Sequence, residues 1–132
     1  MRALAQEPAK LLHEGIEHHK HGMLDQAARL YEQALEVEPS QADALHLLGV
    51  IAHQRGDHAA AIERIRRAIG INGHNAAYYS NLGVSYRSLG RTGEALAAFR
   101  RALELSPTSP GIRFNLGNAL KDATEFADAA TE

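Results

Sequence analysis

Glycine recurs in this chain at a fixed interval of thirty-four residues, at Gly15, Gly49, Gly83 and Gly117. Two further sets keep the same interval: Ala27, Ala61, Ala95 and Ala129, and Gly22, Gly56 and Gly90. A repeat of this length is typical of stacked supersecondary units, each of which buries its apolar face against the next unit. The chain is therefore predicted to be an array of three complete units and part of a fourth.

Each unit contains two apolar stretches with the spacing of an amphipathic helix, separated by a glycine. Aromatic residues make up 5% of the chain, tryptophan is absent, and alanine and leucine are abundant, which favours helix over strand. The predicted fold class is all-α, with two antiparallel helices per unit. We expect helices over 9–21, 24–37, 42–55, 58–71, 76–89, 92–105 and 111–121.

The repeated small residues have distinct predicted roles. Gly22, Gly56 and Gly90 are expected to end the first helix of each unit, because glycine adopts the left-handed cap conformation freely. Glycine inside a helix costs about 1 kcal/mol relative to alanine, so the glycines at 15, 49, 83 and 117 predict a close helix contact. We expect the alanines at 27, 61 and 95 to form the other side of it. Pro39 and Pro107 separate units, with Gly73 midway between them.

The third unit reads Tyr79-x-x-Leu82-Gly83-x-x-Tyr86, followed by Ala95, Phe99, Ala102 and Pro107. This pattern resembles the tetratricopeptide repeat family, with tyrosine in place of the usual leading tryptophan. The second unit departs from it at Gly73, where the proline belongs, and the first at Glu14 and His18. The resemblance implies an α-solenoid of antiparallel helix pairs with a right-handed superhelix. It divides a single domain, 1–132, into repeats 8–41, 42–75 and 76–109 and an incomplete repeat 110–132.

In that family the first helix of each unit lines a concave groove and the second helix lies outside. The resemblance therefore nominates polar first-helix residues as a site for a protein or an extended peptide: His46, His53, Gln54, Ser80, Asn81, Arg87, Asn115, Asn118 and Lys121. A side-chain amide offers both a donor and an acceptor to a peptide backbone. We expect alanine at positions 81, 115 and 118 to weaken binding with little change in thermal stability.

Asn81-Leu82-Gly83 and Asn115-Leu116-Gly117 are similar to the repeats that precede the catalytic domain in O-linked N-acetylglucosamine transferases and their bacterial relatives. There an asparagine ladder holds the substrate chain. His13 and Leu47 occupy the ladder position in the first two units, so at most two rungs exist here. Three functions stay open: a protein- or peptide-binding scaffold, the amino-terminal substrate-selecting portion of a larger glycosyltransferase-like enzyme, and a self-assembly module.

Other classes of function lack support in the sequence. Cysteine is absent, which excludes thiolate chemistry. The net charge is -2, which disfavours nucleic acid and anionic membranes as partners. No phosphate loop, dinucleotide fingerprint or nucleophile elbow appears, so we expect no enzyme activity and no cofactor. The chain lacks a signal peptide and a long apolar run, and the expected compartment is the cytoplasm.

Two clusters of charged residues allow a structural and a functional interpretation. His13 and His18 are five residues apart, which turns them roughly 140° from each other on a helix and excludes a zinc-protease site. Glu14, His18 and His21 lie on one face of the predicted helix. This face either belongs to a polar helix that caps the end of the solenoid or forms a two-histidine metal site, and we predict no metal. Two pairs of arginines recur at the repeat interval on the second helices, Arg66-Arg67 and Arg100-Arg101. They either belong to a solvated face, with ion pairs inside the helix such as Glu63 with Arg67, or form a basic stripe for an acidic partner.

The pattern breaks near the end, where Thr124 occupies the position of the closing glycine. A β-branched residue suits the left-handed cap poorly. We therefore expect residues 111 to about 130 to form one long helix or a loosely closed hairpin. That would leave the apolar face around Leu96, Phe99 and Leu103 exposed, and predicts self-association through the C-terminal helix.

Overall fold

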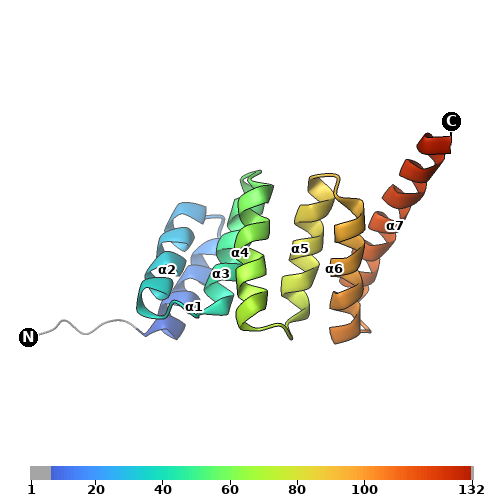
Figure 1. The fold of residues 1–132 in the computed structure, drawn as a ribbon. Helices are drawn as coiled ribbons and strands as arrows, with labels where there is room; N and C mark the ends of the chain where they lie inside the picture. The colour runs from blue at the N-terminus through green and yellow to red at the C-terminus, as the bar shows by residue number, and fades with distance from the viewer. Residues whose placement is uncertain (1–6, 132) are drawn as a thin grey trace, which may run out of the picture.

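Seven helices stack side by side in chain order in the computed structural model, which describes residues 7–131 (Figure 1). They are α1 (Pro8–Lys20), α2 (Leu24–Val37), α3 (Ala42–Gln54), α4 (His58–Ile71), α5 (Ala76–Ser88), α6 (Thr92–Leu105) and α7 (Pro110–Thr131). The all-α solenoid of helix pairs is confirmed, and the first six helices lie within one or two residues of their predicted bounds. None of the helices in the described range is both long and apolar enough to span a bilayer.

The turn inside each complete pair is closed by glycine, as predicted. Gly22, Gly56 and Gly90 have φ values of 73°, 83° and 74°, in the left-handed region that disfavours side chains with a Cβ. The short turn lets the second helix fold back along the first, which brings their apolar faces together. The chain then needs a longer connection to begin the next pair.

The close contact inside each pair joins a glycine to a large side chain. A Cβ added to Gly15 would lie 2.5 Å from the Tyr31 ring, and one on Gly83 would lie 2.5 Å from the Phe99 ring. A Cβ on Gly49 would lie 2.6 Å from Ile65. The prediction that alanine supplies the other side of this contact is therefore wrong at Gly15 and Gly83, whereas at Gly49 the Ala61 carbonyl oxygen, 3.1 Å from the added Cβ, shares the contact with Ile65. The alanines at 27, 61 and 95 are fully buried beside it, and the larger residue one helical turn later fills the space over the glycine.

The core forms a strip along the stack of helices. One cluster of buried residues surrounds Tyr31 in the first unit, and a second extends from Leu45 through Tyr78 to Phe99. Leu35 on α2 packs against both clusters and so links them. Because each unit buries its apolar face on the next, the first helices are held in a row at a regular spacing.

The last helix continues through the position where the earlier units turn. The Thr124 hydroxyl donates a hydrogen bond of 3.1 Å to the carbonyl of Leu120, one turn earlier. Its side chain is therefore accommodated within the continuing helix. Of the two predicted alternatives, the long helix is the one that forms, and its end extends beyond the other helices (Figure 1). Phe99 was expected on an exposed face but is fully buried, because its ring covers Gly83.

Candidate functional site

Polar side chains on neighbouring first helices are joined by contacts between residues thirty-five positions apart. The pairs are His19 with Gln54, Asp43 with Tyr78, His46 with Asn81, Ser80 with Asn115, and Arg87 with Asp122. A step of thirty-four residues reaches the same position in the next unit, and one further residue turns about 100° around the helix. The extra residue points back toward the preceding first helix, and the result is a continuous row of polar pairs.

His46 and Asn81 form the most buried of these pairs. The Asn81 amide donates to His46 Nε2 at 2.7 Å, and the His46 side chain is 8% exposed. The imidazole also lies 4.6 Å, centre to centre, from the ring of Tyr78, whose hydroxyl donates to Asp43. Burial lowers the pKa of His46 to about 4, against a weaker opposing effect of the Asp43 charge. His46 is thus neutral near pH 7 and accepts the Asn81 hydrogen bond.

The Asn81 pair changes one expectation from the sequence. Asn81 is not a free groove amide, because one of its N–H groups is committed to a buried acceptor. Alanine at this position would leave His46 Nε2 without its partner, and an unsatisfied buried acceptor costs about 1–3 kcal/mol. In place of the nearly unchanged stability predicted for alanine at 81, 115 and 118, we therefore expect Asn81→Ala to lower the stability.

Arg87 and Asp122 form a bidentate ion pair between α5 and α7. Arg87 Nε and Nη2 donate to the two carboxylate oxygens of Asp122 at 2.5 and 3.1 Å. The Arg87 hydrogen bond lowers the pKa of Asp122, and the same contact raises the pKa of Arg87. Both side chains are partly exposed, so the pair orients the two helices more than it stabilises the fold.

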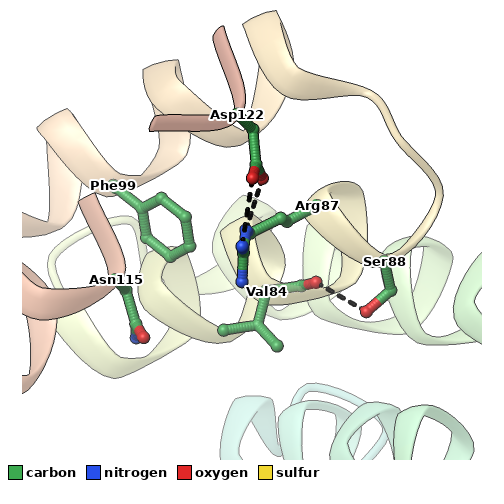
Figure 2. A pocket seen from close by; sticks show the side chains of 6 residues that line it. All are labelled: Val84, Arg87, Ser88, Phe99, Asn115 and Asp122. Carbon is green, nitrogen blue, oxygen red and sulfur yellow. Dashed lines mark hydrogen bonds and ion pairs between the residues drawn. The ribbon is translucent and has the colours of Figure 1, made fainter. Parts of the chain in front are cut away.

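The ion pair borders a pocket of about 240 Å³ (Figure 2). Phe99 and Asn115 lie on one side of it and Ser88 on the other, with Val84 between them. A second pocket, of about 370 Å³, is lined by Ser80, Asn81, Ile112 and again Asn115, among others. Asn115 therefore lies between two neighbouring pockets on the first-helix surface.

Asn115, Asn118 and Lys121 are the predicted site residues with the fewest internal contacts. Asn115 donates to the Ser80 hydroxyl at 3.4 Å, which is a long hydrogen bond. Asn118 is half-buried and Lys121 exposed, one turn apart along α7, and neither has a hydrogen-bond or ion-pair partner among the described residues. Their polar groups are available to a ligand.

The predicted residues of the first two units lie in a separate histidine-rich part of the row. His53 Nδ1 is 2.9 Å from His58 Nδ1 and 3.4 Å from the Ser85 hydroxyl. Burial and the neighbouring His58 lower the pKa of His53. Gln54 accepts from His19, which in turn accepts from Tyr31, whose pKa burial raises to about 12. These side chains have partners within the protein, although Gln54 is itself exposed.

The sequence interpretation missed the partners in these pairs, among them Asp43, Tyr78 and Asp122. Each lies thirty-five residues from another polar residue on a predicted first helix, so adding thirty-five to Arg87 would have identified Asp122. The expected ion pair of Glu63 with Arg67 is not formed in the described part of the chain, where the second-helix pairs are Arg91–Glu94 and Arg101–Glu104. Over residues 7–131 no group of three or more His, Asp or Glu side chains could hold a metal ion.

Comparisons with known proteins return repeat proteins. Residues 12–76 match a family model described as "Tetratricopeptide repeat", and residues 83–122 match one described as "TPR repeat". The chain is 32% identical over 95 residues to human tetratricopeptide repeat protein 7B, a match that covers 72% of this chain and 11% of that protein. It is 30% identical over 105 residues to the peroxisomal targeting signal receptor of Candida albicans, covering 76% of this chain and 18% of the receptor.

Solved structures share the arrangement of helices. The first TPR of Spaghetti (RPAP3), described as bound to the HSP90 peptide SRMEEVD, superposes with a TM-score of 0.86 at 20% identity and covers 94% of this chain and 98% of that one. The MamA protein superposes with a TM-score of 0.81 at 23% identity, covering 94% of this chain and 68% of that one. At these identities the likeness concerns the fold.

Proposed function

The chain belongs to the tetratricopeptide repeat family, and we propose that it is a protein-binding scaffold that holds an extended peptide along its first-helix surface. The curated relatives named above are a repeat protein and a targeting receptor, and the chain spans 11% and 18% of their lengths. One structural neighbour is described as bound to a short peptide, which supports the capacity of this fold to hold one. The alternative of a glycosyltransferase-like enzyme that follows the repeats stays a prediction.

The placement of Asn115 between two pockets carries the proposal. One pocket is bordered by the Arg87–Asp122 pair and the other by Ser80 and Asn81. A peptide that crossed both would pass over Asn115, whose amide offers a donor and an acceptor to the backbone whatever the peptide sequence. Lys121 is exposed on α7, next to Asp122 in the sequence, and its positive charge favours an acidic residue in the ligand.

Peptides selected from a displayed random library provide the test. Asn115→Ala together with Asn118→Ala is expected to weaken the selected peptides about tenfold in calorimetry, since each amide loses hydrogen bonds that form only with ligand. The melting temperature should change little, because the Asn115 bond is long and Asn118 has no internal partner. Asn81 is left intact so that binding and stability remain separable.

Gln33→Ala supplies the matched control, because Gln33 is an exposed amide on the second helix α2. It is expected to leave the affinity unchanged. Selected peptides that bind the double variant as tightly as the parent, or that lose equal affinity with Gln33→Ala, would contradict the concave first-helix surface as the site.

A self-assembly module remains a second candidate, favoured by exposed apolar residues of α7. Phe114, Leu120 and Phe126 are 69%, 42% and 77% exposed, and Phe126 also borders a pocket of about 350 Å³ shared with the start of α6. The three residues are six positions apart and so lie on different sides of the helix, and the part of α7 around Phe126 and its pocket is the contact that we consider. We propose that two chains associate through the C-terminal helix.

Light scattering over a concentration series measures this association. The parent chain is expected to dimerise at high micromolar concentration, and Phe126→Glu to remain monomeric because a carboxylate would be buried at the contact. Gln33→Glu places the same charge on a distant helix and should leave the dimer intact. A parent chain that is monomeric throughout would rule out the association.

A further inference from the structure

The second helices carry a polar and aromatic surface separate from the first-helix site. Between α4 and α6 lies a crevice of about 350 Å³ whose floor is formed by α5. We name it the arginine–tyrosine crevice, defined by Arg66, Tyr79, Leu82, Tyr86, Ala98 and Arg101, with Glu94 also in its lining. Leu82, Tyr86 and Ala98 are largely buried, so they form its apolar base, and the arginines stand at its edges.

Guanidinium groups surround both tyrosines. Arg66 Nη1 donates to the Tyr86 hydroxyl at 3.4 Å, and the Arg91 guanidinium lies 4.9 Å from the centre of the Tyr86 ring. The Arg101 guanidinium lies 5.7 Å from the centre of the Tyr79 ring. These contacts hold the arginine side chains across the crevice, which reduces the conformational entropy that a ligand would have to remove.

The arginines differ in whether a carboxylate neutralises them. Glu94 pairs with Arg91 and Glu104 with Arg101, at 2.7 and 2.8 Å. Arg66 and Arg67 have no carboxylate partner among the described residues, and both line an adjoining pocket of about 460 Å³. The helix α4 that carries them holds three arginines and a single glutamate, in a chain whose net charge is -2. The positive charge that no carboxylate neutralises is therefore carried by Arg66 in the crevice and Arg67 in the adjoining pocket, whereas Glu94 in the crevice is already paired with Arg91.

This chemistry is particular to one crevice and does not follow from the repeat. One unit earlier, the positions of Arg66, Tyr79 and Tyr86 hold Glu32, Leu45 and Ala52. The equivalent crevice between α2 and α4 consequently lacks the tyrosines and carries a glutamate where Arg66 stands. Helix packing alone does not require the charged and aromatic groups.

We propose that the arginine–tyrosine crevice binds a short acidic segment of a partner protein. One carboxylate of that segment pairs with Arg66 at the edge of the crevice, in the bidentate geometry that a guanidinium group offers, and a second pairs with Arg67 in the adjoining pocket. A neighbouring apolar side chain lies over Tyr79 and Leu82. Nucleic acid fits less well, because Tyr86 is 5% exposed and has no ring face free for a stacked base, and because the whole chain is negatively charged.

Fluorescence anisotropy with a defined probe tests the proposal on the full chain. The probe is a labelled peptide of glutamates around one central leucine, with a lysine version of the same peptide for comparison. We expect the glutamate peptide alone to bind, with an affinity that falls as salt is added. Arg66→Glu together with Arg67→Glu should weaken it at least about tenfold, because attraction is replaced by repulsion at two positions.

Arg100→Glu is the matched control. Arg100 is exposed, occupies the position of Arg66 one unit later and lies outside the crevice, so its reversal is expected to leave the affinity within about twofold. The proposal is overturned if the Arg66 and Arg67 reversals have no effect, if Arg100→Glu weakens binding equally, or if the lysine peptide binds as well. A single-stranded oligonucleotide that bound the same arginines more tightly would also overturn it. Asn115→Ala should not alter this binding, so the two surfaces are tested independently.

Discussion

Gly83→Leu is expected to destabilise the fold by about 3 kcal/mol and to lower the melting temperature by about 10 °C. A Cβ at this position would lie 2.5, 2.7 and 2.8 Å from three atoms of the Phe99 ring. Phe99 is fully buried, so the ring cannot move aside without displacing α6 from α5. Thermal unfolding followed by circular dichroism measures the change.

Gly117 provides an internal control, since it occupies the same repeat position as Gly83. No neighbouring atom lies within 4 Å of a Cβ added there, because α7 continues as one helix instead of folding back to cover Gly117 with a second helix. Gly117→Ala should therefore stabilise α7 by up to about 1 kcal/mol, whereas Gly83→Ala should destabilise the protein. Equal effects of the two alanines would show that the helix contact has been assigned to the wrong residues.

Lowering the pH from 7 to 5 should cost about 2 kcal/mol of unfolding free energy through His46. Its folded pKa is lowered from 6.5 to about 4. Between these values the unfolded chain binds a proton that the native chain does not, so stability falls as the pH drops through 6.5 toward 4. The physical cause is that a charged imidazole would lie in a buried site and lose the Asn81 hydrogen bond. Urea unfolding at each pH provides the free energies.

His46→Gln separates this contribution from the rest of the titration. The variant loses some stability at pH 7, but its side chain does not titrate, so the difference between pH 7 and 5 should shrink by about the same 2 kcal/mol. The burial argument fails if His46→Gln retains the full dependence.

Much of the fold could be predicted because its determinants are local in the sequence. The thirty-four-residue interval, the apolar spacing and the glycines at 22, 56 and 90 depend on backbone geometry within one unit, and the observed φ values agree with the predicted caps. Thr124 likewise indicated that the last turn would not close like the others. Knowledge of the repeat position alone could not show that Gly117 has open space where Gly83 has Phe99, because that depends on whether a second helix covers it.

The site could be predicted only as a set of helix faces. The sequence placed Asn81, Arg87 and Asn115 on first helices, which follows from the period. It did not reveal that Asn81 is bonded to His46 or that Arg87 is neutralised by Asp122. Those contacts join residues thirty-five apart, and they depend on how far neighbouring first helices are rotated and staggered.

What the sequence by itself determined is the repeat: its length, its helices, its glycine turns and the family to which they belong. Backbone conformation and helix propensity act over a few residues, so their effects can be read without the partners. Tertiary structure alone decided which polar groups are free. Arg66 contacts the Tyr86 hydroxyl and has no carboxylate partner among the described residues, whereas Arg87 is neutralised by Asp122 on another helix. A side chain's availability depends on its neighbours in space, and helix packing sets those neighbours.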